Sequence, residues 1–214
     1  NIPLLSLVAS YILPVIMSTG MNSLESVSIS YDHLLNMGCP KVYLMHTTNL
    51  YPTPFELVRL GAIPELQSFS SINDVGLSDH TTSNLACFGA VALGAVLLER
   101  HFIDNKDVPG PDIENSMTPN ELKELKEGSY TMYKMRGGSK VELLGEESNT
   151  RDFAIATLVY TSNLPKGHIL TRHDLTPKRP RVGDFDACDL ELLIGKKLAV
   201  DTKADTHLRK CDLN

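Results

Sequence analysis

The stretch VGLSDHTTSNLACFGAVALGAVLLERH, residues 75–101, decides the fold. It predicts a strand ending in Val75-Gly76-Leu77, a helix rich in small residues over about 84–95, and a second short strand at 96–98. Continuous apolar strands that alternate with helices are typical of a parallel sheet covered by helices. The stretch therefore predicts one strand–helix–strand unit of an α/β fold.

The same rhythm extends upstream to the start of the chain. Residues 14–17 and 42–45 are two further apolar strands; Asn22, with Glu25 three positions later, predicts a capping box that opens the helix between them. An apolar helical segment is expected around 55–66. The sequence thus predicts four βα units, about half of a (β/α)8 barrel, which normally needs about 250 residues.

A half barrel has consequences for the chain as it stands. Residues 2–17 are expected to form a buried helix followed by a buried strand, so that the chain begins inside a domain. Two edge strands would stay unpaired, and the apolar side chains of Val15, Leu44 and Leu97 would be exposed on the inner face of the sheet. We therefore expect the isolated chain to be inactive and to aggregate or to dimerise through its edges.

The character of the sequence changes after residue 102. Thr118-Pro119-Asn120-Glu121 predicts a helix start, with a capping threonine, a proline at the first helical position and a reciprocal glutamate. That helix closes a first domain at 1–136, and residues 137–152 are interpreted as a linker. Residues 153–214 contain short β-like runs at 154–160 and 197–200 and predict a small β-rich domain.

Composition restricts the classes of function. A net charge of −6 without a basic block argues against nucleic acid as the main partner. The apolar start lacks a basic leader and is shorter than the roughly 20 residues that cross a bilayer, so no membrane segment is expected. Cys39, Cys87, Cys188 and Cys211 are widely spaced, which favours a cytoplasmic chain with reduced thiols.

Polar residues follow the predicted strands at the edge that forms the active-site face of a barrel. His80 and His101 end two successive strands, and adjacent strands lie about 4.8 Å apart. Both imidazoles could therefore reach one divalent transition metal that acts as a Lewis acid. The alternative is that each histidine only forms hydrogen bonds within a polar rim, and the two readings are about equally supported by the residues alone.

Other polar residues at this edge carry weaker signals. Asn49 and Tyr51 offer donors and acceptors for a sugar or a phosphate, or else belong to a turn before a proline-rich loop. Ser18 lies in a short turn of the kind that can cradle a phosphate. On local grounds Asp112 belongs to a plain turn, and Arg179 is a solvated surface charge.

Seven segments in order carry a family resemblance. They are PVIMSTGMNS, HTTNLYPTPFELVRLGAI, VGLSDHT, SNLACFGAVALGA, LERHF, GPDIENSM and KRPRVGDF. Together they resemble the bacterial N-acetylneuraminate (sialic acid) synthases across essentially the whole chain. The resemblance implies a TIM barrel followed by an antifreeze-like (SAF) domain, of which this chain would be the C-terminal half of the barrel plus that domain.

The resemblance also implies roles for individual residues. His80 and His101 match the ligands of a divalent metal, Mn²⁺ first, with Mg²⁺ or Co²⁺ as alternatives. Ser18 and Ser78 match phosphate-site serines, and Asn49, Tyr51 and Asp112 match substrate-binding positions. Phe153 and Arg179 match residues of the antifreeze-like domain that reach the barrel of the other subunit in a domain-swapped homodimer.

The implied reaction condenses phosphoenolpyruvate with N-acetylmannosamine and gives N-acetylneuraminate and phosphate. The family's catalytic acid and base lie on early barrel strands, so no catalytic acid or base is assigned in this chain. Synthases of legionaminic or pseudaminic acid share the scaffold and are alternatives for the sugar. A third alternative is a non-catalytic fragment in which the antifreeze-like module serves as a binding or dimerisation unit.

Overall fold

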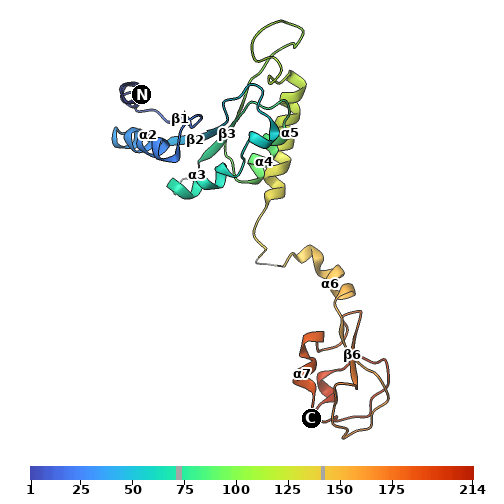
Figure 1. The fold of residues 1–214 in the computed structure, drawn as a ribbon. Helices are drawn as coiled ribbons and strands as arrows, with labels where there is room; N and C mark the ends of the chain where they lie inside the picture. Colours follow the sequence, from blue (N-terminus) through green and yellow to red (C-terminus); the bar gives the residue numbers. More distant parts are fainter. Residues whose placement is uncertain (71–73, 141–142) are drawn as a thin grey trace. The chain divides into compact units, whose positions relative to one another are not determined.

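The computed structural model describes residues 1–70, 74–140 and 143–214, and the chain divides into two compact units, Asn1–Gly138 and Ser139–Asn214. The first unit contains a parallel sheet in the order β1-β2-β3-β4, and the second contains the antiparallel pair β5-β6. Each unit has its own hydrophobic core. Figure 1 shows the elements of both units.

The parallel sheet consists of β1 (Val15–Ser18), β2 (Val42–Thr47), β3 (Val75–Asp79) and β4 (Leu98–Arg100). Its helices are α1 (Ile2–Ala9), α2 (Leu24–Asn36), α3 (Ala62–Ser70), α4 (Leu85–Ala92) and α5 (Pro119–Arg136), with the 3-10 turn η1 (Phe55–Leu57). Every pair of neighbouring strands is parallel and joined by a helix. This arrangement confirms the predicted α/β fold with the strand order of half a (β/α)8 barrel.

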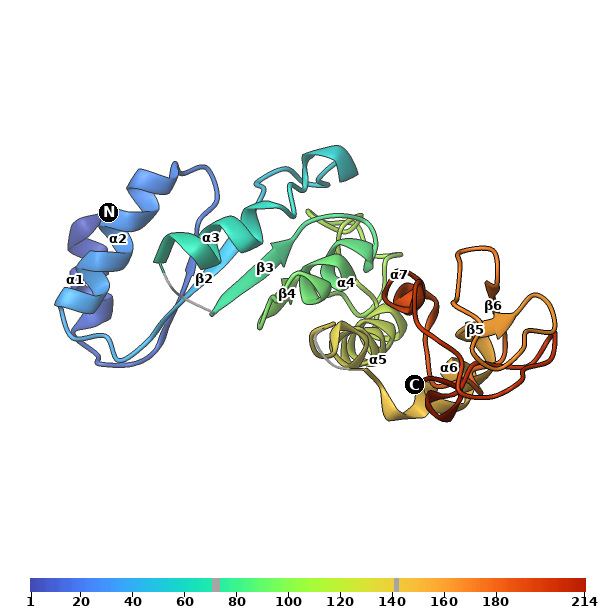
Figure 2. The ribbon, with the colours of Figure 1, turned by 90° about the horizontal axis from the view of Figure 1, so that it is seen from below.

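The two faces of the sheet differ. Leu44, Val75 and Leu77 are almost fully buried in the core that the strands share with the helices, and Figure 2 shows α4 and α5 beside β3 and β4. Ile16, Met45 and Leu97 line a groove of about 420 Å³ on the opposite face. Placing Val15 and Leu44 on the inner face was therefore wrong, because alternation turns them toward the helices and Ile16 and Met45 inward.

Helix boundaries follow local chemistry more closely than apolar spacing. Ser23, rather than Asn22, caps α2, and its side chain accepts a hydrogen bond from the backbone N–H of Ser26 at 3.3 Å. The helical segment predicted around 55–66 is present with other bounds, since a 3-10 turn ends at Leu57 and α3 begins only at Ala62. Thr118 and Glu121 form the predicted reciprocal capping box at the start of α5.

The start of the chain is less buried than its composition suggests. Residues 2–9 form α1, but only Ala9 is fully buried, and Ile2, Leu4 and Leu7 are exposed. The predicted buried helix was therefore wrong, because α1 packs with one face against α2 and leaves the other open. No helix among the described residues combines the length and the apolar character that a membrane crossing requires.

The second unit surrounds a short hairpin. It consists of β5 (Thr157–Tyr160), β6 (Leu175–Lys178), α6 (Ser148–Ala154), α7 (Leu190–Leu193) and the 3-10 turns η2 (Gly145–Glu147), η3 (Ala187–Asp189) and η4 (Lys210–Asp212). Leu158, Leu170, Leu198 and Leu208 are fully buried in its core. Residues 137–152, interpreted from sequence as a linker, contain η2 and the start of α6. Within the run predicted at 197–200, Lys197 and Leu198 form isolated bridges and no strand is present.

Candidate functional site

The carboxyl edge of the parallel sheet gathers most of the predicted site residues. Ser18 ends β1, Thr47 ends β2 and pairs in register with Ser78 on β3, and Asp79 pairs with Arg100 on β4. His80 and His101 are the next residues after that last pair. The parallel register therefore places the two histidines at equivalent positions on neighbouring strands.

Three rings meet at this edge. The ring centroids of His80 and His101 lie 5.3 Å apart, and the Tyr51 ring lies 4.2 Å from His80 and 5.8 Å from His101. Tyr51 comes from the loop after β2, whereas the histidines come from β3 and β4. The structure thus brings together three residues that are up to 50 positions apart in the sequence.

The tautomer of His80 follows from its hydrogen bond. Its Nδ1 lies 2.9 Å from the carbonyl oxygen of Thr48, which can only accept, so Nδ1–H is the donor. In that tautomer the Nε2 lone pair is left to bind another group. A backbone carbonyl that holds one ring nitrogen in this way is typical of a metal-binding histidine.

These two imidazoles fit a divalent ion that keeps open positions for water and substrate. His80 is buried and His101 is about one third exposed, so the pair faces solvent from one side. Within the described part of the chain, no group of three or more His, Cys, Asp or Glu side chains is arranged around a common metal position. A metal at this position would therefore have only the two histidines as ligands among these described side chains.

Asp112 and Asn49 lie beside the three rings. A carboxylate oxygen of Asp112 is 3.9 Å from His101 Nδ1, which is too long for a hydrogen bond. Asn49 donates from Nδ2 to the Tyr51 hydroxyl at 3.4 Å, and its Oδ1 is buried without a hydrogen-bond partner. That amide oxygen packs against Gly20, where a Cβ atom would lie only 1.7 Å from it.

A short row of hydroxyl groups continues along the edge. Ser18 Oγ lies 3.1 Å from Thr47 Oγ1, and Thr47 is opposite Ser78 in the strand register. Thr47 was not predicted as a site residue, nor was Gly20 singled out for its contact with Asn49. The sequence signal that could have found Thr47 is its position among the polar residues that follow the predicted strand at 42–45. The approach of Asn49 to Gly20 has no signal in the sequence.

Phe153 and Arg179 belong to the second unit. Phe153 lies near the end of α6 and Arg179 directly follows β6, and both are exposed. The backbone N–H of Arg181 donates to the carbonyl oxygen of Asp152 at 2.8 Å, which joins the two segments. Both side chains are thus exposed on the second unit. Their contact with the barrel of another subunit stays a prediction.

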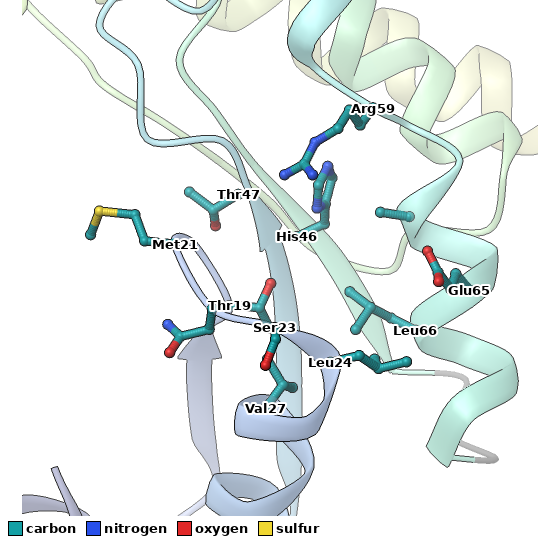
Figure 3. A pocket seen from close by; sticks show the side chains of 12 residues that line it. Thr19, Met21, Ser23, Leu24, Val27, His46, Thr47, Arg59, Glu65 and Leu66 are labelled. Carbon is teal, nitrogen blue, oxygen red and sulfur yellow. The ribbon is translucent and has the colours of Figure 1, made fainter.

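A separate cavity of about 460 Å³ lies between α2 and α3, and none of the predicted site residues lines it. Figure 3 shows His46 and Arg59 close together at its wall, with Glu65 across from them. Burial lowers the pKa of His46, although the bond of its Nε2 to the Val58 carbonyl at 2.7 Å acts in the opposite direction. The cavity is also lined by Thr19 and Thr47 at the ends of β1 and β2, whereas His80, His101 and Tyr51 do not line it.

The thiols are separate from this chemistry. Cys39, Cys87, Cys188 and Cys211 are all free. Burial, followed by the charge of Asp79, raises the pKa of Cys87, so that this thiol stays protonated at neutral pH. A protonated and buried thiol is a poor nucleophile.

Two family descriptions match the chain. The NeuB family matches residues 1–141, and the SAF domain matches residues 155–214. The second match confirms the antifreeze-like fold that was predicted for the small unit.

Proteins with different names are similar to this chain. An uncharacterized protein of Methanocaldococcus jannaschii is 36% identical over 99% of this chain and 62% of its own length. An N,N'-diacetyllegionaminic acid synthase of Campylobacter jejuni is 33% identical over 98% of this chain and 63% of its own. The chain thus spans about three fifths of the length of these relatives.

A solved structure is also similar to this chain. The N-acetylneuraminic acid (sialic acid) synthetase of Leptospira borgpetersenii, in complex with citrate, is 30% identical with a TM-score of 0.66. The match covers 70% of this chain and 52% of that protein.

Proposed function

Because this chain belongs to the NeuB family, we propose that its protein condenses phosphoenolpyruvate with an N-acetylated amino sugar, N-acetylmannosamine first. One water is consumed, and the products are N-acetylneuraminate and phosphate. The observation that carries the proposal is the His80–Tyr51–His101 cluster at the carboxyl edge of the sheet.

His80 and His101 are the residues that would hold a divalent cation, Mn²⁺ first. When bound, such an ion supplies Lewis-acid polarisation of a carbonyl oxygen, which suits the aldehyde of an open-chain sugar. The Thr48 carbonyl keeps the proton of His80 on Nδ1 and leaves Nε2 free for this purpose. Tyr51 covers the His80 ring and excludes water from one side of it.

The other residues of the edge have roles that suit two polar substrates. The hydroxyl groups of Ser18 and Ser78 can donate to phosphate oxygens. Asn49 holds its amide Nδ2 beside the Tyr51 hydroxyl, and the second N–H of that amide can donate to a sugar oxygen. Asp112 can accept hydrogen bonds from further sugar hydroxyls beside His101.

The proposal includes a role for the small unit at the active site of a second subunit. Phe153 and Arg179 are exposed on it, and we assign them to the active site of the other subunit in a domain-swapped homodimer. The proposal also places the protein in the cytoplasm, where phosphoenolpyruvate is available.

The first test is the substitution of either histidine by alanine in the protein as its gene encodes it. Each variant should lose Mn²⁺ binding and synthase activity while the circular dichroism spectrum stays that of the parent, because neither histidine belongs to the hydrophobic core of the unit. His33→Ala is the matched control, since that ring bonds Ser6 on α1 at 2.9 Å in the same unit. Normal turnover by His101→Ala after thorough chelation would refute the site.

A second candidate for the sugar is the precursor of N,N'-diacetyllegionaminic acid, favoured by the 33% identity to the Campylobacter jejuni synthase. The two candidates share the chemistry and differ in the sugar. Competition between the two sugars at equal concentration, with the products separated by mass, decides between them.

A further inference from the structure

A buried ion pair lies directly beneath the two histidines. Arg100 Nε is 3.1 Å from Asp79 Oδ2, and the two side chains are 2% and 1% exposed. The Nε–H does not point at this oxygen, so the contact is an ion pair without a hydrogen bond. A charged pair this deeply buried is costly to desolvate and is weak evidence for stability, which raises the question of what else it does.

Each partner of this pair immediately precedes a histidine. Asp79 ends β3 before His80, Arg100 ends β4 before His101, and the two are paired in the strand register. The ion pair therefore joins the last positions of the two strands before the imidazoles. A shift of one strand along the other would separate the two charges and the two rings together.

The same two side chains also hold the backbone that follows His80. The carboxylate of Asp79 accepts hydrogen bonds from the backbone N–H and the hydroxyl of Thr81, both at 3.0 Å. The guanidinium of Arg100 donates to the Thr81 carbonyl oxygen at 2.6 Å. The backbone on both sides of His80 is thus fixed, because Asp79 precedes it and Thr81, which follows it, is bonded to Asp79 and Arg100.

The guanidinium extends this network to the helices. It donates through Nη1 to Asn84 Oδ1, at the start of α4, at 2.6 Å, and Asn84 Nδ2 donates in turn to the carbonyl oxygen of Glu121 on α5 at 2.9 Å. These bonds connect the strand ends to two helices. A planar fork with several donors makes them at once, which a lysine cannot do.

We propose that Asp79 and Arg100 are positioning residues that fix the distance and orientation of His80 and His101 for a shared divalent cation. The inference rests on the proposed metal site. The groups that orient the ligands of a metal typically change its affinity by about 10- to 100-fold when they are mutated.

The test measures binding of Mn²⁺ alone, from the loss of the EPR signal of the free ion, in the protein as its gene encodes it. Arg100→Lys keeps the charge opposite Asp79 and removes the fork, so its dissociation constant for Mn²⁺ should rise about 10- to 100-fold. Val75→Ala is the matched control, since it truncates a fully buried residue at the other end of β3. It should lower the melting temperature without changing the Mn²⁺ affinity of the folded protein.

The outcomes distinguish a failure of the proposed metal site from a failure of the positioning role. If His101→Ala binds Mn²⁺ as the parent does, the metal site itself is wrong. If His101→Ala loses binding while Arg100→Lys stays within twofold of the parent, the positioning role is overturned. Should Arg100→Lys fail to fold, Asn84→Ala removes one acceptor of the guanidinium and should weaken Mn²⁺ binding several-fold, with unchanged affinity again overturning the role.

Discussion

A methyl group added at Gly20 should displace a side chain of the candidate site directly. A Cβ atom there would lie 1.7 Å from Asn49 Oδ1 and 2.8 Å from Asn49 Cγ, so the amide has to move. Because misplacement of a contacting group by about 1 Å can cost on the order of 100-fold in rate, Gly20→Ala should lower kcat/KM by about 10- to 100-fold. Steady-state kinetics with both substrates measures this effect.

The control is Gly61→Ala, since nothing lies within 4 Å of a Cβ atom at Gly61. That variant should keep the kcat/KM of the parent. Equal kcat/KM for the Gly20→Ala variant and the parent would remove Asn49 from the site.

Arg179 is the second residue that distinguishes the proposal from a surface-charge interpretation. Since a lysine cannot reproduce the planar fork of an arginine, Arg179→Lys should raise the KM for the sugar by about tenfold or more and leave that for phosphoenolpyruvate nearly unchanged. Arg172→Lys, which alters an exposed arginine paired with Glu191 in the same unit, serves as the control. Unchanged KM values for both substrates would reduce the small unit to a structural accessory.

At the scale of the element, α5 depends on its first turn. The backbone N–H of Thr118 donates to Glu121 Oε2 at 2.7 Å, and Thr118 Oγ1 accepts from the Glu121 N–H at 3.4 Å. Loss of such a cap typically costs about 1 kcal/mol. Thr118→Ala should therefore lower the free energy of unfolding by about that amount in urea titrations, whereas an unchanged midpoint would show that the cap is not needed.

The same cap predicts a dependence on pH. The backbone hydrogen bond from Thr118, aided by the bond from Lys106 and opposed by burial, lowers the pKa of Glu121 from its usual 4.5. A carboxyl whose pKa is lower in the folded state stabilises the fold fully above its unfolded value, and this contribution is lost as the pH falls through the folded value. Glu121→Gln should remove this acid-dependent part of the unfolding free energy, and Glu127→Gln on the same helix should retain it.

At the scale of the whole molecule, the exposed apolar surface predicts self-association of the 214-residue chain. Ile16 on β1, the first strand of the sheet, is 61% exposed and lines the inner-face groove. Strand edges and apolar grooves of this kind are sites of intermolecular pairing. Light scattering coupled to size exclusion should show concentration-dependent oligomers, and Ile16→Lys should reduce them.

The matched control for this variant is Leu192→Lys, which removes an exposed leucine of α7 in the other unit. Its oligomers should resemble those of the parent. A monodisperse monomer for the unaltered chain at high concentration would contradict the prediction.

Local patterns in the sequence determined much of the fold. Alternating apolar runs and helical segments predicted the order of the four βα units, and Thr118 with Glu121 predicted the start of α5, because caps and periodicity involve residues only a few positions apart. The placement of His80 and His101 at the ends of adjacent strands followed from the same pattern. The strand register and the ring distances are consistent with that placement.

Only the tertiary structure decided what depends on contacts between distant segments. The burial of Asp79 against Arg100, and of Asn49 against Gly20, joins residues 21 and 29 positions apart through strand register and loop packing. The exposure of α1 and the inward direction of Ile16 likewise depend on which neighbours cover each face. A local pattern shows that a side chain is apolar or charged, but its partner and its burial are set by the register of strands and the packing of helices.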